Sequence, residues 1–92
     1  MRKITAEAFH AWINGKSFNK SNTSVDEAGN VWLHGNLIVK RVGGHTFVSD
    51  GGWGWSMTTR ERLSPWATFS RKNWEAFMND SPYKSGTWVK VS

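Results

Sequence analysis

The chain has 92 residues and a formal net charge of +5, from 12 Lys and Arg against 7 Asp and Glu, and it contains no cysteine. The missing cysteines exclude a disulfide framework and a thiolate zinc site, and no apolar run reaches the roughly 18–20 residues of a membrane-spanning helix. This length predicts one domain over residues 1–92, and the positive charge favours polyanions or acidic protein surfaces as partners.

The N-terminal segment predicts a helix from Ala6 to about Asn14, with Thr5 as its N-cap. Gly15 and Lys16 are suited to close the far end, because glycine adopts the left-handed conformation and a cation favours the negative end of the helix dipole. A helix-spaced apolar stripe, which must pack on a sheet, consists of Phe9, Trp12 and Ile13.

Residues 16–24 are polar and rich in turn formers, which predicts a solvated connector. Its alternative role is contact with phosphates through Lys16 and Lys20. A first strand is expected near residues 23–26. A turn follows, in which Gly29 is placed for a left-handed conformation.

The stretch from 31 to 48 predicts an antiparallel β-meander. Runs rich in β-branched and aromatic residues, at 31–34, 37–42 and 45–48, are separated by Gly35-Asn36 and Gly43-Gly44. Two-residue hairpin loops need positive φ, which glycine supplies without steric cost. Neither face of the runs is fully polar, so the helix is expected on one side and a partner or the second half of the chain on the other.

A second, short helix is predicted over residues 60–64. Thr58 or Thr59 caps it and Pro65 stops it. Leu63 is expected to face the core, whereas both arginines of this helix, Arg60 and Arg62, are expected to face water. The glycine-rich segment 50–55 before it matches neither a dinucleotide fingerprint nor a phosphate-binding loop, so no nucleotide cofactor is predicted.

Further strands are expected in the last third of the chain. Residues 67–71 and 87–91 alternate like strands, while 73–78 fits either a helical turn or a strand. The predicted fold class is α+β: an antiparallel meander of about five to seven short strands, with the N-terminal helix packed on it and a short second helix.

Several motifs span nearly the whole chain in a fixed order. They are NGKSFNKSNTSV (14–25), WLHGN (32–36), SDGGW (49–53), TTRERL (58–63) and KNWEAFMND…GTWVKV (72–91). In these motifs the chain resembles small accessory proteins of tailed phages and prophages, and it departs from them at 54–57 and 81–85. The resemblance favours a strand at 73–78. It implies a small accessory protein in the cytoplasm of an infected bacterium, and it transfers no chemistry.

The residues predict no catalysis. A nucleophile needs a base and a group that orients the base, or a metal with an open position. His34 and His45 flank successive hairpin turns, so they lie at opposite ends of the strand between these turns. At about 3.3 Å per residue this separates them by roughly 20 Å, and they cannot share a metal. The carboxylates show no paired spacing. We therefore expect no catalytic residue, no metal and no cofactor.

Two classes of binding protein remain. The first binds DNA or RNA directly, since lysine and arginine contact phosphate and exposed aromatic rings stack on bases. The second docks on a host protein or nucleoprotein complex, such as a CRISPR effector complex, and inhibits it sterically. The phage context favours the second class.

The densest basic group lies in the second half of the chain and consists of Arg60, Arg62, Arg71 and Lys72. Three tryptophans, Trp53, Trp55 and Trp66, are interleaved with it in the sequence. An alternative stays open, in which these tryptophans fill the core and the arginines cover it with their stems. The residues predicted to contact the partner are Lys16, Lys20, Trp53, Trp55, Arg60, Arg62, Arg71 and Lys72.

Overall fold

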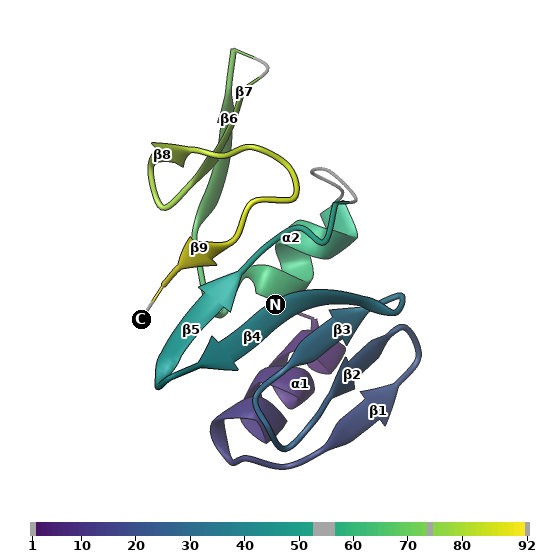
Figure 1. The fold of residues 1–92 in the computed structure, drawn as a ribbon. Helices are drawn as coiled ribbons and strands as arrows, with labels where there is room; N and C mark the ends of the chain where they lie inside the picture. Colours follow the sequence, from purple (N-terminus) through teal and green to yellow (C-terminus); the bar gives the residue numbers. More distant parts are fainter. Residues whose placement is uncertain (1, 53–56, 74, 92) are drawn as a thin grey trace.

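The computed structural model describes residues 2–52, 57–73 and 75–91, which form two helices and two antiparallel sheets (Figure 1). The helices are α1 (Lys3–Ile13) and α2 (Met57–Leu63). The first sheet, ordered β1-β2-β3-β4-β5-β9, contains β1 (Phe18–Lys20), β2 (Thr23–Val25), β3 (Val31–Leu33), β4 (Asn36–Val42), β5 (His45–Val48) and β9 (Val89–Lys90). The second, ordered β6-β7-β8, contains β6 (Phe69–Lys72), β7 (Glu75–Met78) and β8 (Ser81–Pro82). The predicted α+β class is confirmed, with the strands divided between two sheets.

Helix α1 begins earlier than predicted. Its first residue is Lys3 and its N-cap is Arg2, so the prediction that Thr5 caps a helix starting at Ala6 is wrong. Thr5 is instead buried in the first turn, where its hydroxyl accepts a hydrogen bond from Nη1 of Arg62 at 3.0 Å. A polar partner from another element therefore determines the role of this threonine.

The predicted C-terminal end of α1 is confirmed. Gly15 has φ +65°, and the N–H of Lys16 donates to the carbonyl of Ala11, the pattern of a Schellman motif. The predicted apolar stripe is only partly correct, because Ile13 is 56 % exposed. The fully covered apolar position of this helix is Ala8.

The segment predicted as a polar connector contains a strand. β1 pairs antiparallel with β2, with Lys20 opposite Thr23. Ser21 occupies the turn between them with φ +56°. The ladder gives the backbone of this polar segment hydrogen-bond partners, which explains why it is ordered. The first strand expected near residues 23–26 is confirmed as β2.

Strands β3, β4 and β5 form the predicted meander. Gly43-Gly44 makes the second turn, as predicted, with φ +57° and +80°. The first turn is His34-Gly35 rather than Gly35-Asn36, because Asn36 already pairs with Leu33. Both residues of this turn have positive φ, +52° and +79°, as in the type I′ turns that match the twist of the strands.

A β-bulge in β4 interrupts the predicted alternation. Val31 pairs with Val39 and Trp32 pairs with Leu37, which leaves Ile38 as the extra residue. Ile38 and Val39 are adjacent and both fully buried, since two residues of a bulged strand oppose one residue of its partner. Trp32 and Leu37 therefore share the opposite side of the sheet.

Both helices lie on one side of the six-stranded sheet, which we call the core face (Figure 1). Helix α1 packs on β1 and β2. The opposite side is here called the outer face. The buried apolar cluster comprises Ala8, Val25, Val31, Leu33, Ile38, Val39, Val48, Leu63, Ala67 and Met78.

Helix α2 also starts earlier than predicted. It begins at Met57, so Thr58 and Thr59 lie inside it and neither is its N-cap. The expectation that Leu63 faces the core is confirmed. The expectation that Arg62 faces water is wrong, because this side chain is only 4 % exposed.

The strands predicted in the last third of the chain are largely confirmed. β6 overlaps residues 67–71, and β7 shows that 73–78 contains a strand rather than a helical turn. The strand predicted over 87–91 is limited to β9. β9 pairs with β5 and forms one edge strand of the first sheet.

Gly29 supports a close approach between the β2–β3 turn and β4. It is buried with φ +92°, and a Cβ built on it would lie 3.0 Å from Cβ of Arg41. We expect Gly29→Ala to lower the free energy of unfolding by about 1–3 kcal/mol in urea denaturation. Gly44→Ala is the control, since it has φ +80° but open space around the added Cβ. Equal losses in both variants would contradict a role for the contact with Arg41.

Candidate binding surface

The structure separates the residues predicted to contact a partner. Lys16 and Lys20 are exposed beside α1 and β1, at one end of a molecule 38 Å long, and Arg71 is exposed on β6 at the other end (Figure 1). Lys20 also forms an ion pair with Glu7 at 3.3 Å. Lys72 ends β6, and Trp53 and Trp55 lie outside the described residues. These residues therefore do not form one basic patch.

Arg62 is a structural residue. Its Nε donates to Oγ1 of Thr23 at 2.9 Å and its Nη1 donates to Oγ1 of Thr5, so the guanidinium joins β2 to α1. Glu61 lies 3.8 Å from Nη1. Burial lowers the pKa of Arg62, and Glu61 partly opposes this effect. A side chain held in this way cannot be a steering charge on the surface.

Arg60 is half-buried. Together with Met57 and Phe69 it lines an open hollow of about 550 Å³ beside α2 and β6. Its Nε is buried and has no hydrogen-bond partner among the described residues. Glu61 also lines the hollow, so the charges there are mixed and the hollow offers no net positive site.

Two tryptophans help to close the core face. Trp12 and Trp66 meet edge to face with ring centroids 5.5 Å apart, and Phe9 contacts both rings. Arg41 lies over the Trp12 ring at 4.2 Å. For Trp66 the core-filling alternative is confirmed, because it packs against the buried cluster, as does Trp12 of the predicted apolar stripe.

The outer face carries a row of basic and aromatic residues that run across three strands. Phe47 of β5 lies directly between Lys40 of β4 and Lys90 of β9 in the strand register. Residues directly opposite each other in a sheet share a face. Trp88 joins this row, since Nζ of Lys40 lies 4.2 Å from the centroid of its ring and 5.9 Å from that of Phe47. We call Lys40, Phe47, Trp88 and Lys90 the basic-aromatic row.

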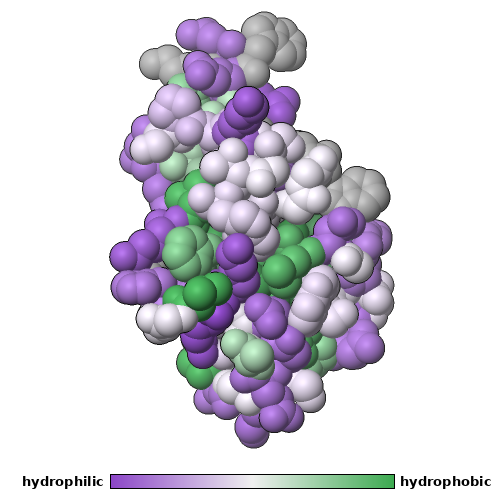
Figure 2. Space-filling view, viewed as in Figure 1, coloured by the Kyte–Doolittle hydropathy of each residue, from purple (hydrophilic) through white to green (hydrophobic). Residues whose placement is uncertain are grey.

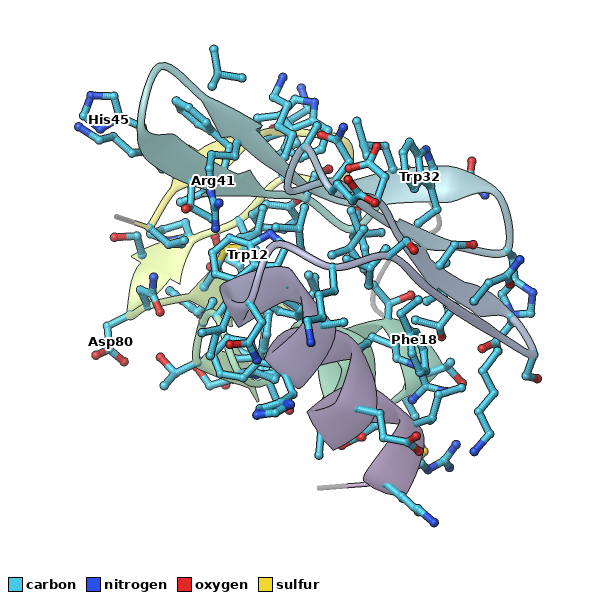
Figure 3. All side chains as sticks on the ribbon, turned by 90° about the horizontal axis from the view of Figure 1, so that it is seen from below. Trp12, Phe18, Trp32, Arg41, His45 and Asp80 are labelled. Atoms are coloured by element: carbon cyan, nitrogen blue, oxygen red, sulfur yellow. The ribbon has the colours of Figure 1, made fainter. Side chains whose placement is uncertain are left out.

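Further apolar and basic side chains flank the row on the same face. Val42, which pairs with His45, is 54 % exposed. Towards the other edge, half-buried Trp32 points away from α1, whereas Trp12 lies on the α1 side (Figure 3). Figure 2 views the outer face and shows apolar side chains set among hydrophilic ones over β4 and β5. No described helix covers this face (Figure 1).

The charge of the first sheet is entirely positive. Its six strands, all in the described part of the chain, contain no Asp or Glu, and their basic residues are Lys20, Lys40, Arg41 and Lys90. No carboxylate on these strands offsets the charges of Lys40 and Lys90, which favours a positive potential over the outer face.

A hydrogen-bond network positions the segment that carries Trp88 and Lys90. Asp50, at the end of β5, is only 1 % exposed, and its Oδ1 accepts the N–H of Gly52 at 2.9 Å and that of Gly86 at 2.8 Å. The Tyr83 hydroxyl accepts the N–H of Asp50 at 3.0 Å and donates to the carbonyl of Thr87 at 2.7 Å. The network therefore holds residues 83–87 against the end of β5.

The ionisation of this network follows from its contacts. Burial alone would raise the pKa of Asp50, but hydrogen bonds from Ser85, Gly86, Gly52 and Tyr83 hold it below its ordinary value. Burial raises the pKa of Tyr83. The carboxylate is therefore charged and the phenol neutral at neutral pH, as the donor and acceptor pattern requires.

The sequence predicts a strand over 87–91 but does not predict the basic-aromatic row. The row depends on the pairing of β9 with β5, which brings Lys90 next to Phe47. Nothing in the local sequence specifies which edge a two-residue strand joins.

Neither described helix has the length and apolar character needed to cross a bilayer. Within residues 2–52, 57–73 and 75–91, no three His, Asp or Glu side chains gather closely enough to hold a metal ion.

Comparisons with known proteins give one family. Residues 1–90 match the family described as "Kyanoviridae Gp96 protein". Neither the comparison with curated proteins nor the comparison with solved structures gives a match.

Proposed function

The chain belongs to the Kyanoviridae Gp96 protein family of phages, and we propose that it is an accessory protein that binds host machinery and blocks it sterically. It acts in the cytoplasm of the infected bacterium and catalyses no reaction. The target is a complex that handles nucleic acid, for which a CRISPR effector complex is the leading candidate. Docking of the protein keeps that complex from engaging its own target.

The observation that supports this proposal is the outer face. No described helix covers this face of a sheet whose strands carry no carboxylate, and it presents Phe47 between Lys40 and Lys90, with Trp88 under the ammonium of Lys40. Aromatic side chains supply most of the energy at binding hot spots, and lysines speed the encounter with a negatively charged partner. Complexes that handle nucleic acid present negative charge, either on their bound strands or on acidic subunits.

Affinity purification from infected cells tests the proposal. The tagged protein should capture one host complex, and Lys40→Gln with Lys90→Gln should reduce the captured amount at least about tenfold, since a close charge pair across an interface contributes about 1.5–7 kcal/mol. Adding the protein should lower target binding by the captured complex in proportion to occupancy.

The matched control is Arg2→Gln with Lys3→Gln. It removes the same charge from exposed positions at the start of α1, on the other side of the sheet. Capture should be unchanged by the control pair. Equal capture by both double variants and by the wild type, with all three proteins folded, would refute docking through the outer face.

A further inference from the structure

We propose that the outer face binds a single strand of nucleic acid, whose phosphates contact Lys40 and Lys90 and whose bases stack on the half-buried aromatic rings of this face. This inference rests on the proposed function and specifies what the protein touches within its target. The ligand class is single-stranded DNA or RNA, held without base-specific hydrogen bonds.

The order of chemistry along the basic-aromatic row supports a single strand. Lys40, Phe47 and Lys90 are direct neighbours across three strands. Since neighbouring strands lie about 4.7–4.9 Å apart, the two lysine Cα atoms are roughly 10 Å apart with an aromatic residue between them. A single strand likewise alternates anionic phosphates with flat bases. Proteins that bind such strands combine a positive groove with aromatic stacking platforms.

A second platform lies farther along the same face. Trp32 on β3 is half-buried, points away from α1 and shares its side of the sheet with Leu37 (Figure 3). A strand that crosses the sheet from β9 to β3 therefore meets positive charge first and an indole ring last. The absence of Asp and Glu from these strands, all of them described, removes repulsion along the path.

Lys40, at the β4 end of the row, is held in place before any ligand binds. Nζ of Lys40 lies over the Trp88 ring at 4.2 Å, and an ammonium over an indole ring is attracted by the ring quadrupole. The network around Asp50 fixes the backbone just before Trp88. Such prior order reduces the entropy lost on binding, which favours an extended ligand on a shallow surface.

A duplex fits this surface less well. It offers phosphates to the lysines, but its bases are stacked inside, so the aromatic rings of the outer face would meet no base. An acidic protein segment would likewise satisfy the charges and leave the rings without stacking partners. The combination of charges and rings therefore favours unpaired bases.

Fluorescence anisotropy with labelled 15-residue oligonucleotides tests the inference on the whole chain. We expect submicromolar binding of single-stranded DNA or RNA at low salt, with at least tenfold weaker binding of duplex DNA. Lys40→Gln with Lys90→Gln should reduce the slope of log K against log salt by up to about 1.4, since each phosphate contact contributes about 0.7 for a single strand. Trp32→Ala should weaken binding about fivefold or more and leave the salt slope unchanged.

Controls and outcomes separate this inference from the proposed function. Arg2→Gln with Lys3→Gln should keep wild-type affinity, and thermal melting checks that every variant is folded. A preference between the DNA and RNA probes identifies the source of the strand, and either preference supports the inference. Equal binding of duplex and single strand would overturn it. The absence of binding at low salt would also overturn it. If capture of the host complex then still required Lys40 and Lys90, the proposed function would stand without this inference.

Discussion

Arg62→Ala is expected to lower the free energy of unfolding by about 3–5 kcal/mol. The guanidinium is 4 % exposed and donates to the hydroxyls of Thr23 and Thr5. Its removal leaves both buried hydroxyls without this donor and opens a cavity between α1, α2 and β2. Urea denaturation should show the loss directly, and the melting temperature should fall by at least about 12 °C.

Arg71→Ala is the matched control, since it removes the same side chain from an exposed position of β6. Its effect should stay within about 0.5 kcal/mol. A similar small effect for Arg62→Ala would show that the buried hydrogen bonds contribute little, and Arg62 would again be a candidate for partner contact.

Asp50→Ala is expected to cost about 2–4 kcal/mol. The change leaves the part-buried N–H groups of Gly52 and Gly86 without their acceptor, and a polar group left unsatisfied away from water costs up to about 1–3 kcal/mol. It should also loosen β9 and so weaken partner capture through Lys90. The exposed residue Glu27 supplies the control, Glu27→Ala, which should be nearly neutral in the same denaturation and capture assays.

The contribution of Asp50 should depend on pH in one direction. Because its folded-state pKa lies below the ordinary value, it stabilises the fold above the unfolded pKa of about 3.9. This stabilisation is lost as pH falls through the folded-state pKa. The stability difference between wild type and Asp50→Asn should therefore be largest above about pH 5 and should shrink below about pH 4. Asp26 and Glu61, whose pKa values are also lowered, titrate in both proteins and cancel in the difference.

Urea denaturation of both proteins between pH 6 and pH 2 checks this dependence. A stability gap that stays constant over the whole range would contradict it. That result would mean that the carboxylate gains nothing from its charge in the folded state.

Local chemistry was enough to predict the hairpins and one helix end. The turn at Gly43-Gly44 and the Schellman motif at Gly15 depend on positive φ over a few residues, and glycine adopts it at little cost. The sequence predicts the first turn one residue too late, at Gly35-Asn36. Gly35 fits a turn at either position, and only the pairing of Asn36 with Leu33 sets the turn at His34-Gly35. Periodicity alone fits either a helical turn or a strand at 73–78. Only the resemblance to phage accessory proteins favours the strand.

The candidate site depended on contacts between distant parts of the chain. Charge and position made Arg62 resemble a surface arginine. It is buried because Thr5 and Thr23, far from it in sequence, supply hydroxyl acceptors next to it. In the same way, the pairing of β9 with β5 places Lys90 beside Phe47.

The sequence by itself determined where the chain turns, because a turn is decided by the backbone preferences of neighbouring residues. Only the tertiary structure decided which charged side chains are buried and which gather on the outer face. The physical reason is that desolvation of a charged side chain depends on the groups that surround it after folding. For Arg62 those groups come from elements that local sequence patterns do not bring together. The neighbour of Lys90 on the outer face, Phe47, likewise comes from a strand far away in the sequence.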